Sequence, residues 1–318
     1  MNILITGGAG FIGSHVGRHL AAEGHHIIVL DDFNDYYDPG IKRDNLRERL
    51  PEAKVIAGDI RDKEAVRTAF GEKPEAVIHL AARAGVRPSI QDPELYLSTN
   101  LNGTYNILEA ARQNGLKDIV FASSSSVYGV NPKVPFAEDD LLQSTISPYA
   151  MTKLAGEQMC SNFSHLYGMR AICLRFFTVY GPGQRPDLAI HKFSRWIWDG
   201  RPVDMYGDGS TERDYTYIDD IVQGVVAAFR YTDKSFDIFN LGESQTTTLR
   251  DLISTIEDSL GKKAVINRMP EQPGDVPRTF ADISKARRLL GYNPHTKIKD
   301  GIPLFAEWFR GRMEKLHG

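Results

Sequence analysis

Short apolar runs alternate with segments of helical periodicity through the first half of the chain. The runs are apolar at successive positions, as expected for strands that are buried on both faces of a sheet. They cover residues 2–6, 26–30, 54–57, 76–80, 118–123 and 170–176. Helical patterns lie between most of them, at about 10–23, 62–70, 93–114 and 148–167. This alternation predicts an α/β fold in which a doubly wound parallel sheet carries helices on both faces.

The pattern becomes more irregular after about Val179, where a loop rich in glycine and proline begins. A turn at 207–209, a strand at 236–241 and four further helices are expected, the helices at about 189–199, 218–230, 249–260 and 284–290. We therefore predict a second, smaller domain of mixed α/β structure that binds substrate. No linker marks the boundary, and the expected division assigns 1–177 plus about 214–241 to the first domain and 178–213 plus about 242–318 to the second.

Composition narrows the class of protein. The 318 residues carry a formal net charge of -3, so no basic field indicates a nucleic-acid partner. The two cysteines, Cys160 and Cys173, are expected to be reduced thiols, and no cysteine or histidine spacing suggests a metal site. Neither a signal peptide nor an apolar run of about 18 residues is present, so we expect no membrane span and a cytoplasmic location.

A glycine-rich segment lies between the first predicted strand and the first predicted helix. Gly7, Gly10 and Gly13 allow a tight turn and a close approach of a ligand to backbone N–H groups, and Phe11 and Ile12 open the helix. The partial positive charge of a helix N-terminus favours a diphosphate there. A strand before the loop and a helix after it are the context of a Rossmann-type dinucleotide site.

Acidic residues at the end of the second predicted strand indicate which dinucleotide binds. A carboxylate at Asp31 or Asp32 would accept hydrogen bonds from the adenine-side ribose and repel a 2′-phosphate, which favours NAD over NADP. Lys42 and Arg43 are close enough in sequence to complicate the preference for NAD over NADP. The remaining residues assigned to this end of the cofactor are Asn34, Asp59 and Ile60. Asp59 could equally be an ordinary turn or helix-cap aspartate.

Tyr149 and Lys153 are four residues apart on a predicted helix and so share one of its faces. An ammonium group near a tyrosine stabilises the phenolate, and the pair could therefore serve as a catalytic base. A run of serines, Ser123 to Ser126, follows the fifth predicted strand at the edge where parallel sheets bind ligands. Tyr149 and Lys153 could also be an ordinary surface pair, and the serine run could be a solvated turn. The coincidence of both features on one fold favours a catalytic role.

With these motifs in place, the chain resembles the extended short-chain dehydrogenase/reductases over essentially its whole length. Within them it is most similar to nucleotide-sugar 4-epimerases, and in particular to UDP-glucuronate 4-epimerases. The motifs that carry the resemblance are 34–39, Leu80-Ala81-Ala82, 84–87, Asn100, 124–129, Tyr149 with Lys153, 175–187 and Arg213-Asp214-Tyr215. The resemblance implies that Ser124, Tyr149 and Lys153 are catalytic. It also implies that Leu80, Ala81, Ala82, Asn100, Ser123 and Phe176 contact NAD.

The resemblance implies oxidation of a sugar at C4, followed by return of the hydride to the other face. Related 4,6-dehydratases and UDP-glucuronate decarboxylases carry acidic residues where this chain has Ser125 and Ser126, which favours epimerisation. A UDP-glucose or UDP-N-acetylglucosamine 4-epimerase and a UDP-glucuronate decarboxylase remain as alternatives. A catalytically silent NAD-binding regulator is a further one, which the intact Tyr149 and Lys153 disfavour.

An acidic sugar needs a partner for its carboxylate. Arg185 is the leading candidate because a guanidinium can bind a carboxylate through two hydrogen bonds, although it could also be a surface loop residue. Ser125, Ser126 and Thr178 could add hydroxyl donors, and Thr178 replaces an asparagine found in UDP-galactose 4-epimerases. Arg87 is a second candidate, for the carboxylate or the diphosphate.

The uridine diphosphate is expected to bind the second domain. The resemblance implies that uracil lies in the segment from Val203 to Tyr206, although Tyr206 could be a core tyrosine. The residues assigned to the diphosphate and ribose are Lys192, Arg213, Asp275 and Arg278. Gln272 replaces an arginine that the family often has, which puts one phosphate contact in doubt. By analogy with relatives, the helices near 93–114 and 148–167 are expected to pair in a homodimer.

Overall fold

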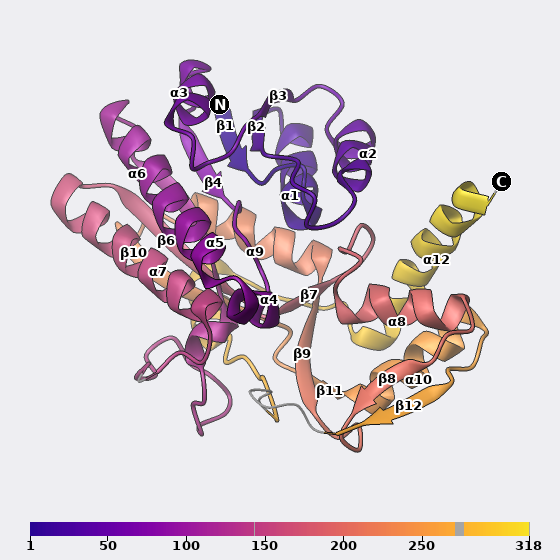
Figure 1. The fold of residues 1–318 in the computed structure, drawn as a ribbon. Coiled ribbons are helices and arrows are strands. Elements are labelled where there is room, and N and C mark those ends of the chain that lie inside the picture. The colour runs from indigo at the N-terminus through magenta and orange to yellow at the C-terminus, as the bar shows by residue number, and fades with distance from the viewer. Residues whose placement is uncertain (143, 271–276, 318) are drawn as a thin grey trace.

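The computed structural model describes residues 1–142, 144–270 and 277–317, and its centre is a parallel sheet of seven strands (Figure 1). The strands run in the order β10-β6-β5-β4-β1-β2-β3. Their bounds are β1 Asn2–Thr6, β2 His26–Asp31, β3 Lys54–Ala57, β4 Ala76–His79, β5 Asp118–Ser124, β6 Arg170–Phe176 and β10 Phe236–Leu241. The predicted α/β fold with a doubly wound Rossmann-type sheet is confirmed, and the order reverses between β1 and β4, which opens a ligand crevice at that edge.

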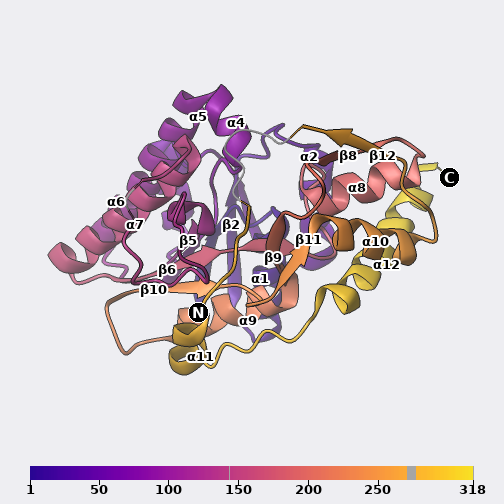
Figure 2. The ribbon, with the colours of Figure 1, turned by 90° about the horizontal axis from the view of Figure 1, so that it is seen from below.

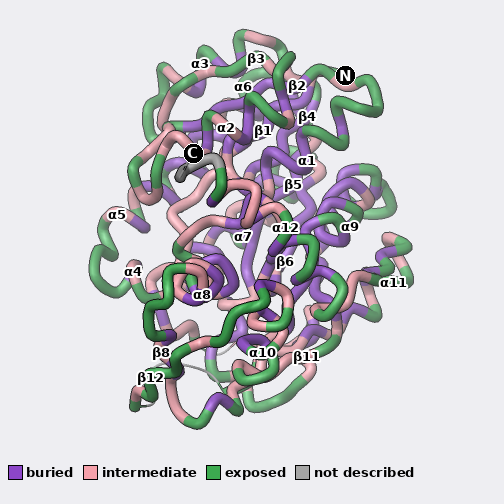
Figure 3. The backbone as a smooth tube through the Cα atoms, turned by 90° about the vertical axis from the view of Figure 1, so that its right-hand side faces the viewer, coloured by how far each residue is buried: buried purple, intermediate pink, exposed green. Residues whose placement is uncertain are grey.

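The sheet is buried on both faces because its strands are apolar at successive positions. In β1, Ile3 and Ile5 belong to one hydrophobic cluster and Leu4 to the other, and all three are fully buried. Side chains alternate across a strand, so the inner strands contribute to two cores at once, whereas the edge strand β3 has no buried residue. Figure 3 shows the result as buried backbone through β1, β4, β5 and β6, with exposed segments at the periphery.

Helices cover the two faces of the sheet (Figure 2). On one face, α1 contacts both α2 and α9. On the other, α3 contacts α6, and α7 packs along β5 and β6. Their bounds are α1 Phe11–Ala22, α2 Pro39–Arg49, α3 Lys63–Gly71, α6 Thr104–Gln113, α7 Pro148–Tyr167 and α9 Ile218–Arg230. Helix α7, which carries Tyr149 and Lys153, is thus anchored directly on the centre of the sheet.

The prediction of a single helix for 93–114 is wrong in one respect, because the chain forms three consecutive helical pieces there. Helix α5 covers Pro93–Leu97, a π-helical turn covers Ser98–Gly103, and α6 follows. Inside the turn the Asn100 side chain donates to the Arg83 carbonyl and to Thr152 Oγ1, both at 3.0 Å. A π-helical turn widens the helix locally and is common at functional sites, and apolar periodicity alone does not reveal it.

The sequence pattern missed several other elements. Helix α4 covers Val86–Gln91, a 3₁₀ turn η2 covers Ser125–Tyr128, and α12 covers Ile298–His317. The remaining helices agree with the predicted segments, namely α8 Ala189–Trp198, α10 Leu249–Leu260 and α11 Ser284–Leu290. No helix in the described part of the chain is long and apolar enough to cross a membrane.

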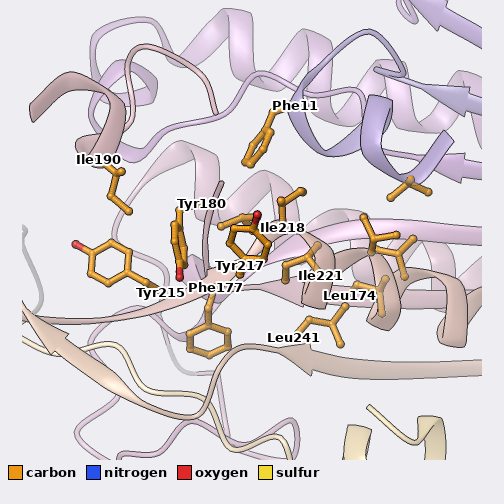
Figure 4. Packing of buried hydrophobic residues seen from close by; sticks show 14 of the residues in the cluster. Phe11, Leu174, Phe177, Tyr180, Ile190, Tyr215, Tyr217, Ile218, Ile221 and Leu241 are labelled. Carbon is orange, nitrogen blue, oxygen red and sulfur yellow. The ribbon is translucent and has the colours of Figure 1, made fainter. Parts of the chain in front are cut away.

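Two small sheets lie outside the large one. Their orders are β11-β9-β7 and β12-β8. The strands are β7 Thr178–Tyr180, β8 Val203–Tyr206, β9 Glu212–Tyr217, β11 Thr246–Thr248 and β12 Ile266–Met269. The expected division of the chain near 178, 214 and 242 stays a proposal, and strand β9, Glu212–Tyr217, runs across position 214. One hydrophobic cluster includes residues from both sides of these positions, and Figure 4 shows Tyr180 and Tyr217 among packed side chains that also include Leu174 and Leu241.

Candidate functional site

A cavity of about 390 Å³ lies along the carboxyl ends of the central strands and continues between the two parts of the chain. It brings together most of the residues singled out from the sequence. The predicted residues that line it are Gly7, Gly10, Phe11, Ile12, Gly13, Asp31, Asp32, Asn34, Lys42, Asp59, Ile60, Leu80, Ala81, Ala82, Ser123, Ser124, Ser125, Ser126, Tyr149, Lys153, Phe176, Thr178 and Arg185.

The glycine loop forms a cradle that side chains would fill. Gly7 has a φ of 69°, and a Cβ atom there would lie 2.8 Å from the backbone nitrogen of Ala81. A Cβ on Gly13 would lie 2.4 Å from the Gly7 carbonyl oxygen. Helix α1 begins beyond Gly10 without a side-chain cap, so its first N–H groups are available to a ligand. The loop therefore fits the diphosphate of a dinucleotide.

The acidic pair after β2 is built into this cradle. Asp31 accepts from the Ala9 N–H at 3.2 Å and from the Phe33 N–H at 3.0 Å, and burial raises its pKa. Lys42 Nζ lies 3.2 Å from Asp31 and 3.5 Å from Asp32. Arg43 stacks on Phe33 at 5.6 Å from the ring centroid. Lys42 and Arg43, the two cations that complicated the preference for NAD over NADP, therefore both contact protein groups. The preference for NAD stands.

Asp59 lies at the far wall of the cavity and is held by its neighbour Arg61. The Arg61 Nε and Nη2 atoms donate to Asp59 Oδ2 at 2.9 and 2.6 Å, and the Arg61 N–H donates to Oδ1 at 2.7 Å. Burial opposes the charge, but these hydrogen bonds lower the pKa of Asp59. Asp59 thus combines both sequence-based interpretations, a turn residue and a wall of the cofactor site.

Tyr149 and Ser124 meet at the catalytic end of the cavity. The Tyr149 hydroxyl and Ser124 share a hydrogen bond, while Ser124 Oγ accepts from the Ser126 N–H at 3.2 Å. Burial raises the pKa of Tyr149, and the hydrogen bond with Ser124 opposes this effect. A tyrosine and a serine at hydrogen-bonding distance can bind the same sugar hydroxyl and move its proton.

Lys153 lies one helical turn from Tyr149 but points elsewhere. Its Nζ donates to the Ala122 carbonyl at 2.7 Å and lies 6.0 Å from the centroid of the Tyr149 ring. Burial lowers the pKa of Lys153 to about 8. The expectation that Lys153 holds down the pKa of Tyr149 is not met in the protein by itself, because burial outweighs the distant ammonium.

A buried ion pair supports the catalytic helix from below. Arg175 donates from Nε and Nη2 to the two oxygens of Glu157, each at 2.9 Å, and both side chains are almost inaccessible to solvent. Ser123 Oγ donates to Glu157 at 2.5 Å. Glu157 is one turn beyond Lys153 on α7, so the pair joins this helix to β5 and β6 at the level of the site.

Arg185 enters the cavity from the loop between β7 and α8, and sequence reasoning missed its partners. Its Nε and Nη2 atoms donate to the two Asp187 oxygens at 3.0 and 2.8 Å. Its guanidinium carbon lies 5.4 Å from the centroid of the Tyr36 ring. Although burial opposes the charge, Asp187 raises the pKa of Arg185, which stays a cation. The motif at 34–39 held the signal for Tyr36, but nothing in the sequence placed it beside Arg185.

Other predicted residues lie outside the cavity. Asn100 is 3% exposed, and its amide bonds to Arg83 and Thr152. Val203 is fully buried and its N–H donates to the Val265 carbonyl at 2.7 Å, so the prediction that it contacts the substrate is wrong: it is a core residue. Lys192 is exposed and lies 4.4 Å from the centroid of the Trp196 ring.

The described residues assigned to the nucleotide are not among those that line this cavity. The Arg87 guanidinium carbon lies 5.3 Å from the Tyr206 ring centroid and so bridges α4 and β8. Arg278 Nε lies 2.8 Å from Glu212, and Arg213 Nη1 donates to the Glu212 carbonyl at 2.8 Å. Asp275 lies outside the described residues. The nucleotide contacts of this group stay predictions.

No group of three or more histidine, cysteine, aspartate or glutamate side chains that could hold a metal ion occurs in the described segments. Cys160 and Cys173 are both buried free thiols.

Comparison with known proteins agrees with this geometry. The sequence profile of the NAD dependent epimerase/dehydratase family matches residues 3–242. A probable UDP-glucuronate 4-epimerase from Rhizobium meliloti is 40% identical over 338 residues, which cover 100% of this chain and 99% of the relative.

Two solved structures have the same fold. The UDP-glucuronic acid 4-epimerase from Bacillus cereus, in complex with UDP-glucuronic acid and NAD, superposes with a TM-score of 0.90 at 36% identity. The match covers 98% of this chain and 100% of that one. The UDP-glucose 4-epimerase from Thermotoga maritima, with UDP-glucose, gives 0.91 at 34% identity, with 98% and 100% covered.

Proposed function

This chain belongs to the NAD dependent epimerase/dehydratase family, and we propose on that basis that it interconverts UDP-glucuronate and UDP-galacturonate by inverting C4 of the sugar. It is then an NAD-dependent isomerase. The observation that carries the proposal is one cavity that holds both Tyr149 with Ser124 and the cation of Arg185. The first two can act on a sugar hydroxyl, and the third can bind a sugar carboxylate.

The residues of the glycine loop and those at the catalytic end of the cavity have different roles. The residues of the glycine loop would hold NAD, which would supply the acceptor and later the donor of the C4 hydride. Tyr149 removes the proton of the C4 hydroxyl and gives it back after the sugar has turned over. Ser124 holds the C4 oxygen by a hydrogen bond, and Lys153 binds the cofactor ribose. Because this proton and the hydride both return to the sugar, the reaction consumes no further reactant.

The carboxylate distinguishes this substrate from neutral sugars. Arg185 supplies the charge, and Ser125, Ser126 and Thr178 line the same cavity as hydroxyl donors. The place where decarboxylases carry an acidic residue is occupied by neutral serines. Relatives named for UDP-glucuronate, from Rhizobium meliloti and Bacillus cereus, support this choice of sugar.

The uridine diphosphate is proposed to bind beside α4, β8 and β9. Tyr206 is the aromatic surface for uracil, and Arg87, Arg213 and Arg278 are cations for the diphosphate. Lys192 and Asp275 complete the proposed nucleotide site.

The product of UDP-glucuronate decides the proposal. We expect NMR of the purified enzyme with this substrate to show UDP-galacturonate as the product. A UDP-pentose or a released ketopentose without UDP-galacturonate would contradict it. Equal or faster turnover of UDP-glucose would favour a neutral-sugar epimerase and would remove Arg185 from its role.

We also propose that the protein is a cytoplasmic homodimer. Helices α6 and α7 lie side by side on one flank of the molecule (Figure 1). Large apolar side chains remain exposed on α5, α6 and α7, namely Leu97, Tyr105, Leu166 and Tyr167. Burial of these side chains against a second copy would remove apolar surface from water. Light scattering of the wild type and of Tyr105→Arg tests this, since a dimer that the substitution does not weaken would exclude this interface.

Two free thiols favour a reducing compartment.

A further inference from the structure

The guanidinium of Arg185 is fixed at one edge by a carboxylate of its own loop. Asp187 takes the donors on Nε and Nη2. A guanidinium has five N–H donors in a plane, so this pairing leaves the Nη1/Nη2 edge able to receive a second carboxylate through two hydrogen bonds. The Arg185 side chain is 20% exposed and the Asp187 side chain 33% exposed, so the pair lies at the boundary between the cavity and solvent.

The loop that carries Arg185 and Asp187 is itself immobilised. Gln184 is 1% exposed, donates to the Val179 carbonyl at 3.0 Å and accepts from the His191 N–H at 3.1 Å. His15 of α1 reaches the Pro182 carbonyl through Nε2 at 2.8 Å. A carbonyl only accepts, so this nitrogen carries the proton. The Arg185–Asp187 pair is therefore held in place by the hydrogen bonds of Gln184 within the same loop and by the contact of His15, on α1, with the Pro182 carbonyl.

A tyrosine from the other side of the cavity covers one face of the guanidinium. Tyr36 stacks over Arg185, and its hydroxyl shares a hydrogen bond with the hydroxyl of Tyr96. Tyr96 donates to the Ala84 carbonyl at 2.8 Å, and its ring meets the Tyr149 ring edge-on at 6.2 Å between centroids. Gly85 leaves room for the Tyr36 hydroxyl, since a Cβ there would lie 3.2 Å from it. The aromatic contacts thus link the carboxylate anchor to the catalytic tyrosine.

We propose that Asp187 and Tyr36 are positioning residues that hold the plane of the Arg185 guanidinium, so that the substrate carboxylate keeps one orientation while C4 is a ketone. This inference rests on the proposed function. Asp187 fixes the edge and Tyr36 the face, which leaves the guanidinium little freedom to rotate. Neither residue needs to touch the sugar, because both act through Arg185.

The orientation matters because the oxidised sugar is a β-keto acid. In the side reaction the C5–C6 bond breaks, its electron pair forms the enolate of the C4 ketone, carbon dioxide leaves, and water supplies a proton to C5. Beyond the C4 oxidation that belongs to the proposed function, this step needs no oxidant. It is fastest when the C5–C6 bond stands perpendicular to the carbonyl plane, a geometry that a loosely held carboxylate reaches more often.

The test measures how each turnover ends. UDP-glucuronate labelled at its carboxyl carbon is incubated with each enzyme, and released carbon dioxide is divided by the UDP-galacturonate formed. We expect Asp187→Asn and Tyr36→Leu to raise this ratio about tenfold or more, because small losses of alignment have large kinetic effects. Tyr36→Phe keeps the ring over Arg185 and should stay near the wild type.

A matched control comes from a second arginine–aspartate pair. Arg195 Nε lies 2.8 Å from Asp199 on α8, so Asp199→Asn makes the same chemical change away from the cavity and should leave the ratio unaltered. An unchanged ratio in Asp187→Asn and Tyr36→Leu would overturn the proposal. So would a lower KM for Asp187→Asn at the wild-type ratio, since Asp187 would then only compete with the substrate.

The outcomes separate this inference from the proposed function. If the wild type forms no UDP-galacturonate, the function itself fails, whatever the variants do. If it does form this product and the ratios do not move, only the positioning role fails. Should Asp187→Asn not fold, the comparison of Tyr36→Leu with Tyr36→Phe still decides.

Discussion

At the scale of single residues, burial governs the ionisation of the catalytic groups more than their contact with each other does. Tyr149 has a raised pKa and Lys153 a lowered one, and burial is the largest cause of both shifts. Ser124 is the neighbour that counteracts burial at Tyr149. In the proposed mechanism Tyr149 is the base, so its raised pKa must be lowered when the site is filled.

Removing that hydroxyl gives the first prediction. Tyr149→Phe should reduce kcat by at least about 10²-fold, because the proton of the sugar hydroxyl loses its acceptor. Its ring still fills the same space, so the melting temperature should stay close to that of the wild type. Steady-state kinetics with thermal unfolding checks both, and an unchanged rate would remove Tyr149 from the role of base.

The lysine gives a prediction about stability and pH. The pKa of Lys153 is about 8 in the folded protein and 10.5 as its ordinary value. Between these two values the unfolded chain binds more protons than the folded one, so this residue makes the free energy of unfolding rise with pH. Lys153→Met should lose that rise.

Chemical denaturation at the two ends of this pH window gives the slope of the free energy of unfolding against pH. The slope is measured for the wild type and for Lys153→Met, and the difference between the two slopes is the contribution of Lys153. Taking the difference cancels the contribution of other groups that titrate there. Equal slopes for the wild type and Lys153→Met would contradict the lowered pKa.

At the scale of elements, the contact between α7 and β5 sets the position of the catalytic end. The two elements approach each other at Gly156, where a Cβ atom would lie only 2.3 Å from Phe121 Cζ. Phe121 is 2% exposed and belongs to a hydrophobic core cluster. Glycine at this position therefore lets the helix that carries Tyr149 and Lys153 lie directly on the sheet.

Gly156→Ala should push α7 away from β5. We expect a loss of about 1–3 kcal/mol in the free energy of unfolding from overpacking. A fall in kcat of about tenfold or more should follow from displaced catalytic groups. Denaturation and kinetics on the same preparation measure both effects.

Gly311 in α12 is the matched control, because a Cβ there meets nothing within 4 Å. Gly311→Ala should keep full activity and gain about 0.5–1 kcal/mol from helix propensity. If Gly156→Ala behaved like this control, the close packing of α7 would not matter for catalysis.

At the scale of the whole molecule, one aspartate joins segments that are distant in sequence. Asp214 of β9 accepts from the N–H groups of Glu243, Ser244 and Ala281 at 2.7, 3.1 and 3.1 Å. It is fully buried. The segment after β10 and the segment before α11 are thus both attached to β9.

Asp214→Asn should destabilise the protein by about 3 kcal/mol, because the amide replaces an acceptor by a donor that faces backbone N–H groups. Urea unfolding measures the loss. Asp233→Asn, at an exposed position, should stay within about 0.5 kcal/mol of the wild type. A loss at Asp214 no larger than that of the control would show that these hydrogen bonds do not stabilise the fold.

The parallel sheet and the cofactor end were predictable because their signals are local. Strands 2–6 and 118–124 are built around the continuous apolar runs 3–5 and 119–122, and Gly7, Gly10 and Gly13 lie within seven consecutive residues. The strands of the two small sheets, β7, β8, β9, β11 and β12, were missed. They are short and half-buried, and long-range pairing stabilises them more than their own pattern does.

The doubly wound sheet, the dinucleotide loop and the four-residue spacing of Tyr149 and Lys153 therefore follow from the amino-acid sequence alone. Each depends on residues that are neighbours along the chain. Only the tertiary structure placed Tyr36 over Arg185 and turned Lys153 towards the Ala122 carbonyl. These contacts depend on how distant segments pack, and burial, which arises from that packing, decides the charge of the groups that meet there.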